Sequence, residues 1–164
     1  MSFRIVVSFK EGVKDALGEG VKSSVMDDLG IIVNSVETAD VYEVEGISSS
    51  DISKITELVA DPVVQAVSEA EQENGWLIEV GFLNGVTDNA AETTRQAIKD
   101  IVRKDVSVRT SKLYCIKGAR KDEIARICNS LLYNKLIQFC KVKDKNKLHN
   151  NTFSVREDPK DEKP

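Results

Sequence analysis

The first ten residues alternate between apolar and polar side chains, which is the pattern of a strand with one buried face. A turn follows, and its Asp15 can accept hydrogen bonds from the free N–H groups at the start of a helix. Apolar residues then recur every three or four positions up to Gly30, which suits the left-handed end of a helix. The apolar positions are Phe3, Ile5, Val7 and Phe9 in the predicted strand and Leu17, Val21, Val25 and Leu29 in the predicted helix.

Further elements are predicted up to about residue 67. Two short strands are expected near residues 32–38 and 40–46, and a second helix begins within residues 48–51. Its apolar face carries Ile52, Ile55 and Leu58, and a strand over residues 63–67 closes the group. The predicted order is β-α-β-β-α-β, as in the ferredoxin-like split βαβ unit.

The same order recurs in the second half of the chain. Residues 12–15, Gly-Val-Lys-Asp, reappear as Gly-Val-Thr-Asp at 85–88, a shift of 73 residues, and further matches follow to the closing strand. We interpret the chain as a tandem duplication with repeats at residues 1–72 and 73–143 and a flexible polar tail at 144–164. Matched pairs at this shift include Ile5 and Ile78, Val7 and Val80, Phe9 and Phe82, Asp61 and Asn134, and Gln65 and Gln138, and a one-residue deletion between them aligns Thr38 with Thr110.

One such repeat would cover one face of its sheet with two helices and leave the other face bare. Two repeats can bury their bare faces against each other. We therefore expect an α+β fold in which two ferredoxin-like repeats pack sheet to sheet as an internal pseudo-dimer. In the second repeat, strands are predicted near residues 76–82, 105–110, 112–117 and 136–142.

Charge is divided unequally between the two repeats. Residues 1–73 carry 5 basic and 15 acidic side chains, whereas residues 74–164 carry 18 and 12, so the formal net charge of −4 combines −10 with +6. This division suits modules that face each other or a shared partner, and equally two solvated surfaces. The chain has no apolar run that could span a membrane, begins without a secretory signal pattern and contains three cysteines. These features predict a cytoplasmic protein.

Side chains that could catalyse a reaction are few. The only histidine, His149, falls in the predicted tail, where a fixed imidazole is not expected. The three cysteines, at positions 115, 128 and 140, lack metal-binding spacing and lie in apolar patterns, which favours buried thiols. Paired carboxylates such as Asp27 and Asp28 are helix neighbours that point apart. We therefore predict no catalytic residue and no metal site.

Ligand-binding motifs are equally weak. Gly12, Gly18 and Gly20 lie between a strand and a helix, but their spacing is not that of a phosphate-binding loop and their neighbours are acidic. This favours a role in helix packing. Aromatic residues make up only 5% of the chain, and the basic run at residues 141–147 has none, so nucleic acid is not an expected partner. No cofactor-binding residue and no membrane partner are predicted.

The repeat motifs resemble a known family. The segment Trp76-Leu-Ile-Glu-Val-Gly-Phe-Leu-Asn-Gly-Val-Thr-Asp-Asn89 is similar to a signature of the PurS-type small subunit of phosphoribosylformylglycinamidine synthase, and residues 9–15, 40–42 and 61–65 are similar in the first repeat. The resemblance covers about residues 3–142. The tandem form resembles the N-terminal region of the long single-chain synthases, which mimics a dimer of the small subunit. Two features depart from the family: the sequence stops at Pro164 without a synthetase domain, and Asn84 stands where proline is common.

The resemblance implies a non-catalytic role in purine biosynthesis. The family's enzyme amidates formylglycinamide ribonucleotide with ATP and with ammonia released from glutamine. The small subunit joins the glutaminase to the synthetase and helps to align the ammonia route, while ATP and magnesium belong to the synthetase. These two subunits are the expected partners, and further self-association is also compatible with the resemblance. Whether the chain is a free subunit or a fragment of a longer synthase stays open.

The glycine turns are the candidate interface residues of such a subunit. Their alternative interpretation is that they are two ordinary helix starts. A different function, a tandem ferredoxin-like module that senses a small molecule between its repeats, also stays open, and an independent enzyme is a third and weaker hypothesis. The candidate residues are Gly12, Val13 and Asp15 in the first repeat and Gly85, Val86, Asp88 and Asn89 in the second.

Overall fold

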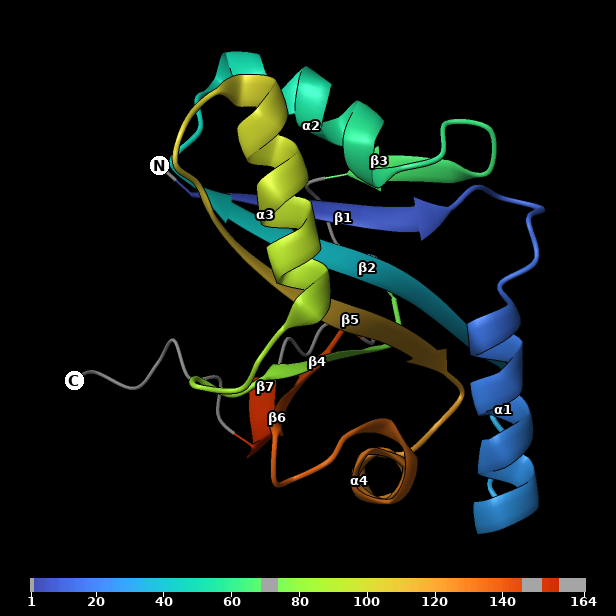
Figure 1. The fold of residues 1–164 in the computed structure, drawn as a ribbon. Helices are drawn as coiled ribbons and strands as arrows, with labels where there is room; N and C mark the ends of the chain where they lie inside the picture. The colour runs from blue at the N-terminus through green and yellow to red at the C-terminus, as the bar shows by residue number, and fades with distance from the viewer. Residues whose placement is uncertain (1, 69–73, 146–151, 157–164) are drawn as a thin grey trace. The chain divides into compact units, whose positions relative to one another are not determined.

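The computed structural model describes residues 2–68, 74–145 and 152–156, which form the predicted α+β fold (Figure 1). The strands are hydrogen-bonded in the order β3-β1-β2-β5-β4-β6-β7. In the described part of the chain, no helix has the length and apolar character needed to cross a membrane. The elements are β1 (Ser2–Phe9), α1 (Ala16–Leu29), β2 (Ser35–Glu45), α2 (Ile52–Val59), β3 (Gln65–Ser68), β4 (Trp76–Phe82), α3 (Asn89–Val102), β5 (Ser107–Lys117), α4 (Lys121–Ile127), β6 (Gln138–Asp144) and β7 (Thr152–Arg156).

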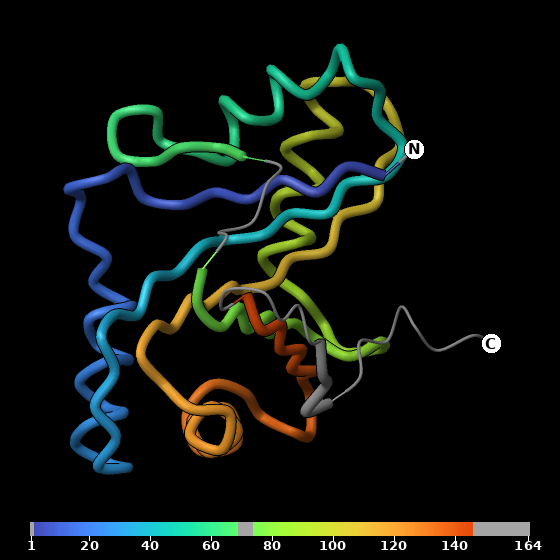
Figure 2. Tube along the Cα trace, turned by 180° about the vertical axis from the view of Figure 1, so that it is seen from behind, coloured from blue at the N-terminus to red at the C-terminus, as the bar shows by residue number. Residues whose placement is uncertain are grey.

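The sequence pattern predicts two short strands in the middle of each repeat, and this prediction is wrong. A single strand, β2, spans residues 35–45, and β5 likewise spans residues 107–117 (Figures 1 and 2). The sequence around Thr38 contains no glycine or proline that would turn the backbone, so the chain continues as a strand. Among the described residues, each repeat (1–72 and 73–143) therefore contributes three strands instead of four, and a contiguous ferredoxin-like repeat is not confirmed.

The two sheets predicted from the sequence are also replaced by one. The strand order makes β2 and β5 hydrogen-bonded neighbours, so the strands of both halves belong to the same sheet. Sequence pattern alone could not show this, because it indicates which face of a strand is buried and not which strand lies beside it.

The chain folds into two compact units, and each unit combines segments from both halves of the sequence. The first unit comprises residues 1–14, 39–71 and 87–111, and the second unit comprises residues 15–38, 72–86 and 112–164. The segments 15–38 and 87–111, which we call the exchanged segments, correspond to each other at the 73-residue shift and differ by one residue in length. Each contains a helix and half of a long strand. The sequence repeats are thus contiguous along the chain, whereas the compact units are built by reciprocal exchange of equivalent segments.

The core of the first unit joins α2 and α3 to β1 and the adjoining part of β2. Ile55 of α2 and Ile98 of α3 are fully buried, and they belong to one apolar cluster with Ile5, Val7 and Val44 of the strands. The same helices lie side by side over these strands in Figure 1. The apolar stripe of α3 therefore covers strands of the opposite repeat.

The core of the second unit includes the other exchanged helix, α1. Val25 of α1 is fully buried in a cluster with Trp76 and Ile78 of β4 and with residues of β5, α4 and β6. The indole Nε1 of Trp76 donates a hydrogen bond to the carbonyl of Ala119 at 2.9 Å, so the ring is fixed at its polar end as well. Helix α1 ends at Gly30 with φ of 68°, which confirms the predicted left-handed helix end.

Part of the predicted tail is a strand. Residues 152–156 form β7, which pairs antiparallel with β6 from Lys143 opposite Thr152 to Cys140 opposite Arg156, with an irregularity between Cys140 and Lys141. The sequence Thr-Phe-Ser-Val-Arg alternates polar and apolar residues, a signal that the low apolar content of the surrounding tail obscured. His149 and the rest of the tail at residues 146–151 and 157–164 lie outside the described residues.

Candidate functional site

The two glycine turns have the same backbone structure. In the first, the N–H of Val13 donates to the carbonyl of Lys10 at 3.0 Å, and in the second the N–H of Val86 donates to the carbonyl of Leu83 at 3.2 Å. The third residue of each turn is a glycine with positive φ, 82° at Gly12 and 84° at Gly85. A side chain in this conformation would be strained, so the turn geometry requires glycine at both places.

Asp15 and Asp88 are helix caps that also bind a strand. The Asp15 carboxylate accepts from the N–H of Gly18 at 2.8 Å, and at Thr38 from the N–H at 2.6 Å and from Oγ1 at 2.9 and 3.0 Å. Asp88 accepts from the N–H of Ala91 at 2.9 Å and from the N–H and Oγ1 of Thr110 at 2.8 to 3.2 Å. The interpretation of these aspartates as helix starts is therefore confirmed.

A second loop lies beside each glycine turn. Residues 61–64 are held next to the first turn by the N–H of Lys10, which donates to the carbonyl of Val64 at 2.9 Å. Residues 134–137 are held next to the second turn by the N–H of Leu83, which donates to the carbonyl of Ile137 at 2.9 Å. We call residues 10–13 with 61–64 the first loop pair, and residues 83–86 with 134–137 the second loop pair.

The loops at 61–64 and 134–137 are held by identical hydrogen bonds. Asp61 accepts through Oδ1 from the N–H of Val63 at 3.0 Å, and its own N–H donates to Oε1 of Gln65 at 2.8 Å. In the other loop, Asn134 accepts from the N–H of Leu136 at 2.9 Å and donates its N–H to Oε1 of Gln138 at 2.8 Å. The matched Asp/Asn and Gln positions in the two repeats are the sequence signal for these loop hydrogen bonds, but a sequence match alone does not place them beside the glycine turns.

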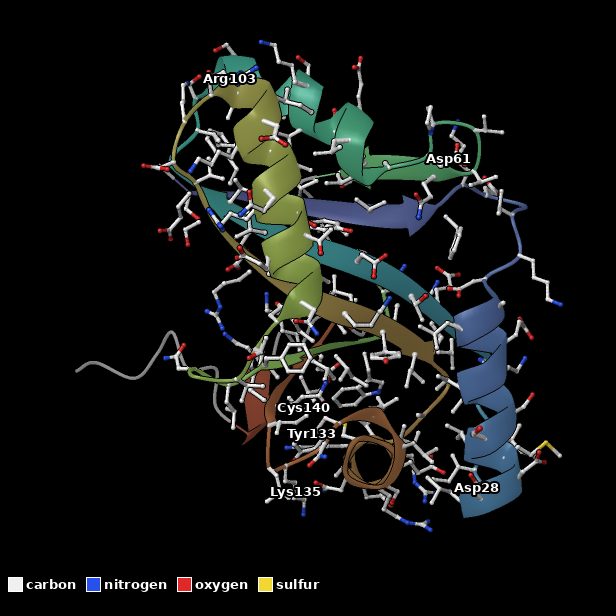
Figure 3. All side chains as sticks on the ribbon, viewed as in Figure 1. Asp28, Asp61, Arg103, Tyr133, Lys135 and Cys140 are labelled. Atoms are coloured by element: carbon white, nitrogen blue, oxygen red, sulfur yellow. The ribbon has the colours of Figure 1, made fainter. Side chains whose placement is uncertain are left out.

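The side chains on the two loop pairs differ although the backbone is shared. Each loop presents an apolar tip, Val63 with 77% and Leu136 with 85% of its surface exposed. Next to these tips, Pro62 in the first loop pair is replaced by Lys135 in the second. Figure 3 labels Asp61 and Lys135 on these loops, each within its own unit. The predicted candidates Gly12, Val13, Gly85 and Val86 belong to the loop pairs, whereas Asp15, Asp88 and Asn89 belong to the helix starts that follow them.

The cysteines are buried and free, as the sequence predicted. Burial raises the pKa of Cys115 to about 11, and its Sγ donates to the carbonyl of Asn74 at 3.3 Å. A hydrogen bond to Cys140, together with burial, raises the pKa of the Cys128 thiol. Since the thiolate is the reactive form of cysteine, the raised pKa values disfavour reaction of Cys115 and Cys128 near neutral pH.

Another charged group in the interior of the first unit has a structural role. Asp51 is buried and accepts from Nζ of Lys104 at 2.7 Å and from the N–H and Oγ of Ser48, each at 3.0 Å. The hydrogen bond from Lys104, followed by the one from the Ser48 backbone, lowers the pKa of Asp51 to about 2. Among the described residues, no three His, Cys, Asp or Glu side chains are grouped as a metal site would require.

Gly18 has a packing role, in line with the sequence prediction for the glycines of this region. A Cβ atom at Gly18 would lie 2.3 Å from the carbonyl oxygen of Val36, so only glycine lets α1 approach β2 this closely. At Gly20, by contrast, a Cβ atom would meet nothing within 4 Å.

Comparison with known proteins does not assign the chain to a family. No protein-family model matches the chain, and no curated protein matches its sequence.

Proposed function

We propose that the chain is a non-catalytic bridging subunit of phosphoribosylformylglycinamidine synthase. In this role it joins the glutaminase to the synthetase and aligns the route of ammonia between them. The motif resemblance suggests this enzyme. The observation that carries the bridging role is the presence of two loop pairs with the same backbone hydrogen bonds and different exposed side chains.

A bridge between two different proteins needs two surfaces that are rigid and chemically distinct. The Asp61–Gln65 and Asn134–Gln138 hydrogen bonds fix each loop before binding, which lowers the entropic cost of association. The exposed tips Val63 and Leu136 can each enter a pocket of a partner, and their different neighbours allow each loop pair to select a different one. ATP, magnesium and the glutamine-hydrolysing residues belong to the partners under this proposal.

The proposal includes a pseudo-dimer of ferredoxin-like modules, in which the two repeats exchange the segments 15–38 and 87–111. It is supported by the first unit, where β3, β1, part of β2 and part of β5 are accompanied by the two helices α2 and α3. Four strands with two helices are the content of a split βαβ unit. One helix and one half-strand of that unit come from the opposite repeat.

Reconstitution with the synthetase and glutaminase of the source organism tests the function. We expect formylglycinamidine ribonucleotide to form from glutamine only when this chain is present, whereas formation from added ammonia needs the synthetase alone. Leu136→Glu and Val63→Glu should each reduce the glutamine-dependent rate at least tenfold, because a buried tip contributes about 1.4 kcal/mol or more to an interface. Ile32→Glu, at an exposed apolar position outside both loop pairs, is the control and should leave the rate unchanged. Glutamine-dependent synthesis at full rate without the chain would refute the bridging role.

A further inference from the structure

The outer edge of β3 differs from the equivalent edge of β6. At the 73-residue shift, Val67 of β3 corresponds to Cys140 of β6, and Phe9 opposite Gln65 corresponds to Phe82 opposite Gln138. The β6 edge is covered by β7, whereas β3 is the last strand at its end of the sheet among residues 2–68, 74–145 and 152–156. The first unit thus presents an edge at the position where the second unit binds a strand.

The register shows which backbone groups of β3 point outward. The bond from the N–H of Lys10 to the carbonyl of Val64 marks a hydrogen-bonded pair, so the next such pair is Ser8 with Ala66. The alternation leaves Val67 in a pair whose N–H and C=O groups point away from β1. In β6, the equivalent residue Cys140 pairs with Arg156 of β7. Val67 therefore directs its backbone groups to the side where a further strand would add.

Two side chains of β3 are more exposed than their equivalents in β6, as expected for an edge that no strand among the described residues covers. Val67 is 37% exposed and Cys140 is fully buried, while Ala66 is exposed and its equivalent Phe139 is 2% exposed. Phe9, the diagonal neighbour of Val67 on the same face of the β1–β3 pair, is 38% exposed. An added strand with alternating apolar side chains would bury Val67 and Phe9 and pair with the outward backbone groups.

Charge around this edge favours a basic strand. Glu57 and Asp61 are exposed in the element and loop that precede β3. From residue 52 to residue 73 the sequence contains five acidic residues and one basic residue, Lys54, and Lys10 adds a second positive charge next to this loop, where its Nζ donates to the carbonyl of Pro62. Strand β3 itself is uncharged, but two copies of the segment 52–73, each with an excess of acidic residues, would repel each other. A partner strand that carries lysine or arginine would be attracted.

We infer that the β3 edge of the first unit is a docking site for an extended strand of a partner protein, with apolar residues at alternate positions and at least one basic residue. Binding occurs by β-strand addition, in which main-chain hydrogen bonds supply affinity and alternate side chains supply specificity. This inference goes beyond the proposed function and does not rest on it, because it depends only on β3, its equivalent in β6 and the charge around the edge.

A peptide based on β7 provides the probe, because this sequence already pairs with the equivalent edge. Lys-Thr-Phe-Ser-Val-Arg-Lys is titrated into the ¹⁵N-labelled full chain, and amide signals are followed by NMR. We expect shifts and hydrogen-exchange protection at Val67, with little change at Cys140. The same peptide with N-methylated Phe and Val should bind at least about tenfold more weakly, since strand addition requires its N–H groups. No response at Val67, or a response confined to β6, would overturn the inference.

Variants of the chain separate strand addition from nonspecific attraction. Val67→Pro removes one outward N–H at an edge position, where proline is tolerated. It should keep the unfolding midpoint close to that of the wild type and weaken peptide binding at least about tenfold. The control is Ile32→Lys, which replaces an exposed apolar residue outside β3. This variant should bind the peptide as the wild type does. Equal binding by Val67→Pro, with its fold verified by NMR, would contradict docking at β3.

Discussion

At the scale of single residues, Asp15 and Asp88 connect the start of a helix with the middle of a long strand. Each carboxylate accepts from the helix backbone and from a threonine, Thr38 or Thr110, at the point where the chain passes from one compact unit to the other. Thr38 is itself buried, so its N–H has no access to water as a replacement partner. These aspartates therefore fix the exchanged segments at both of their ends.

Replacing either aspartate should lower stability. Asp15→Ala removes a helix cap and leaves the buried N–H of Thr38 unsatisfied, so we expect the free energy of unfolding to fall by about 2–4 kcal/mol. Urea unfolding followed by circular dichroism measures this. Asp28→Ala, on the exposed surface of α1 (Figure 3), is the control and should change stability by less than about 0.5 kcal/mol. An equal effect of the two substitutions would contradict the role of Asp15.

The Asp51–Lys104 pair makes a pH-dependent contribution to stability. The pKa of Asp51 is about 2 in the folded chain, below its ordinary value of 3.8, so the folded state prefers the ionised carboxylate. The contribution is complete above the unfolded pKa and is lost as pH falls from about 4 towards 2. We expect the stability difference between wild type and Asp51→Asn in urea unfolding to shrink over this range. Lys104→Met should show the same loss, and a difference that stays constant from pH 6 to pH 2 would argue against the pair.

At the scale of elements, the approach of α1 to β2 depends on Gly18. Gly18→Ala places a methyl group against the carbonyl of Val36, and we expect a loss of about 1–3 kcal/mol in unfolding free energy. Gly20→Ala in the same helix has open space and should stabilise the chain by about 0.4–1 kcal/mol. Thermal unfolding of both variants provides the comparison. Stabilisation by both substitutions would show that the helix is not held this close to the strand.

Local patterns predicted several elements correctly. The alternation in β1, the caps at Asp15 and Asp88 and the end of α1 at Gly30 all follow from short-range rules that act within a few residues. The unbroken strands β2 and β5 were missed, because two short strands with a tight turn and one long strand have similar alternation. Strand β7 was missed because five alternating residues within a polar tail are a weak signal.

The candidate site was predicted only in part. Repeat matching identified the glycine turns, and their geometry does require Gly12 and Gly85. The loops at 61–64 and 134–137 complete each loop pair through hydrogen bonds between residues more than fifty positions apart, which periodicity cannot reveal. Their exposed tips, Val63 and Leu136, break the rule that apolar residues are buried and are recognisable only once burial is known.

At the scale of the whole molecule, the exchanged segments make each half of the chain dependent on the other. Residues 1–72 alone lack the β4, β5 and β6 partners of Val25 in α1. We expect this half, expressed alone, to be unfolded or to form a dimer that exchanges α1 between copies. Mixing it with residues 73–164 should restore a 1:1 complex with a buried Trp76, measured by light scattering and tryptophan fluorescence. A folded monomer of residues 1–72 with cooperative unfolding would contradict the exchange.

The same architecture brings two equivalent loop pairs, with different side chains, into one chain. Their hydrogen-bonded backbones and exposed tips are the basis for the bridging role proposed above, and the unequal charge of the two repeats is compatible with different partners. A bridging subunit should contribute to assembly of the complex even when the complex is not catalysing its reaction.

The most direct measurement of this role is native mass spectrometry of the chain mixed with the synthetase and glutaminase subunits in the presence of ATP and glutamine. We expect a complex that contains all three proteins, which Leu136→Glu and Val63→Glu each reduce to a complex with a single partner. Ile32→Glu should assemble as the wild type does. Assembly of the synthetase with the glutaminase alone, while this chain stays separate under the same conditions, would contradict the bridging role.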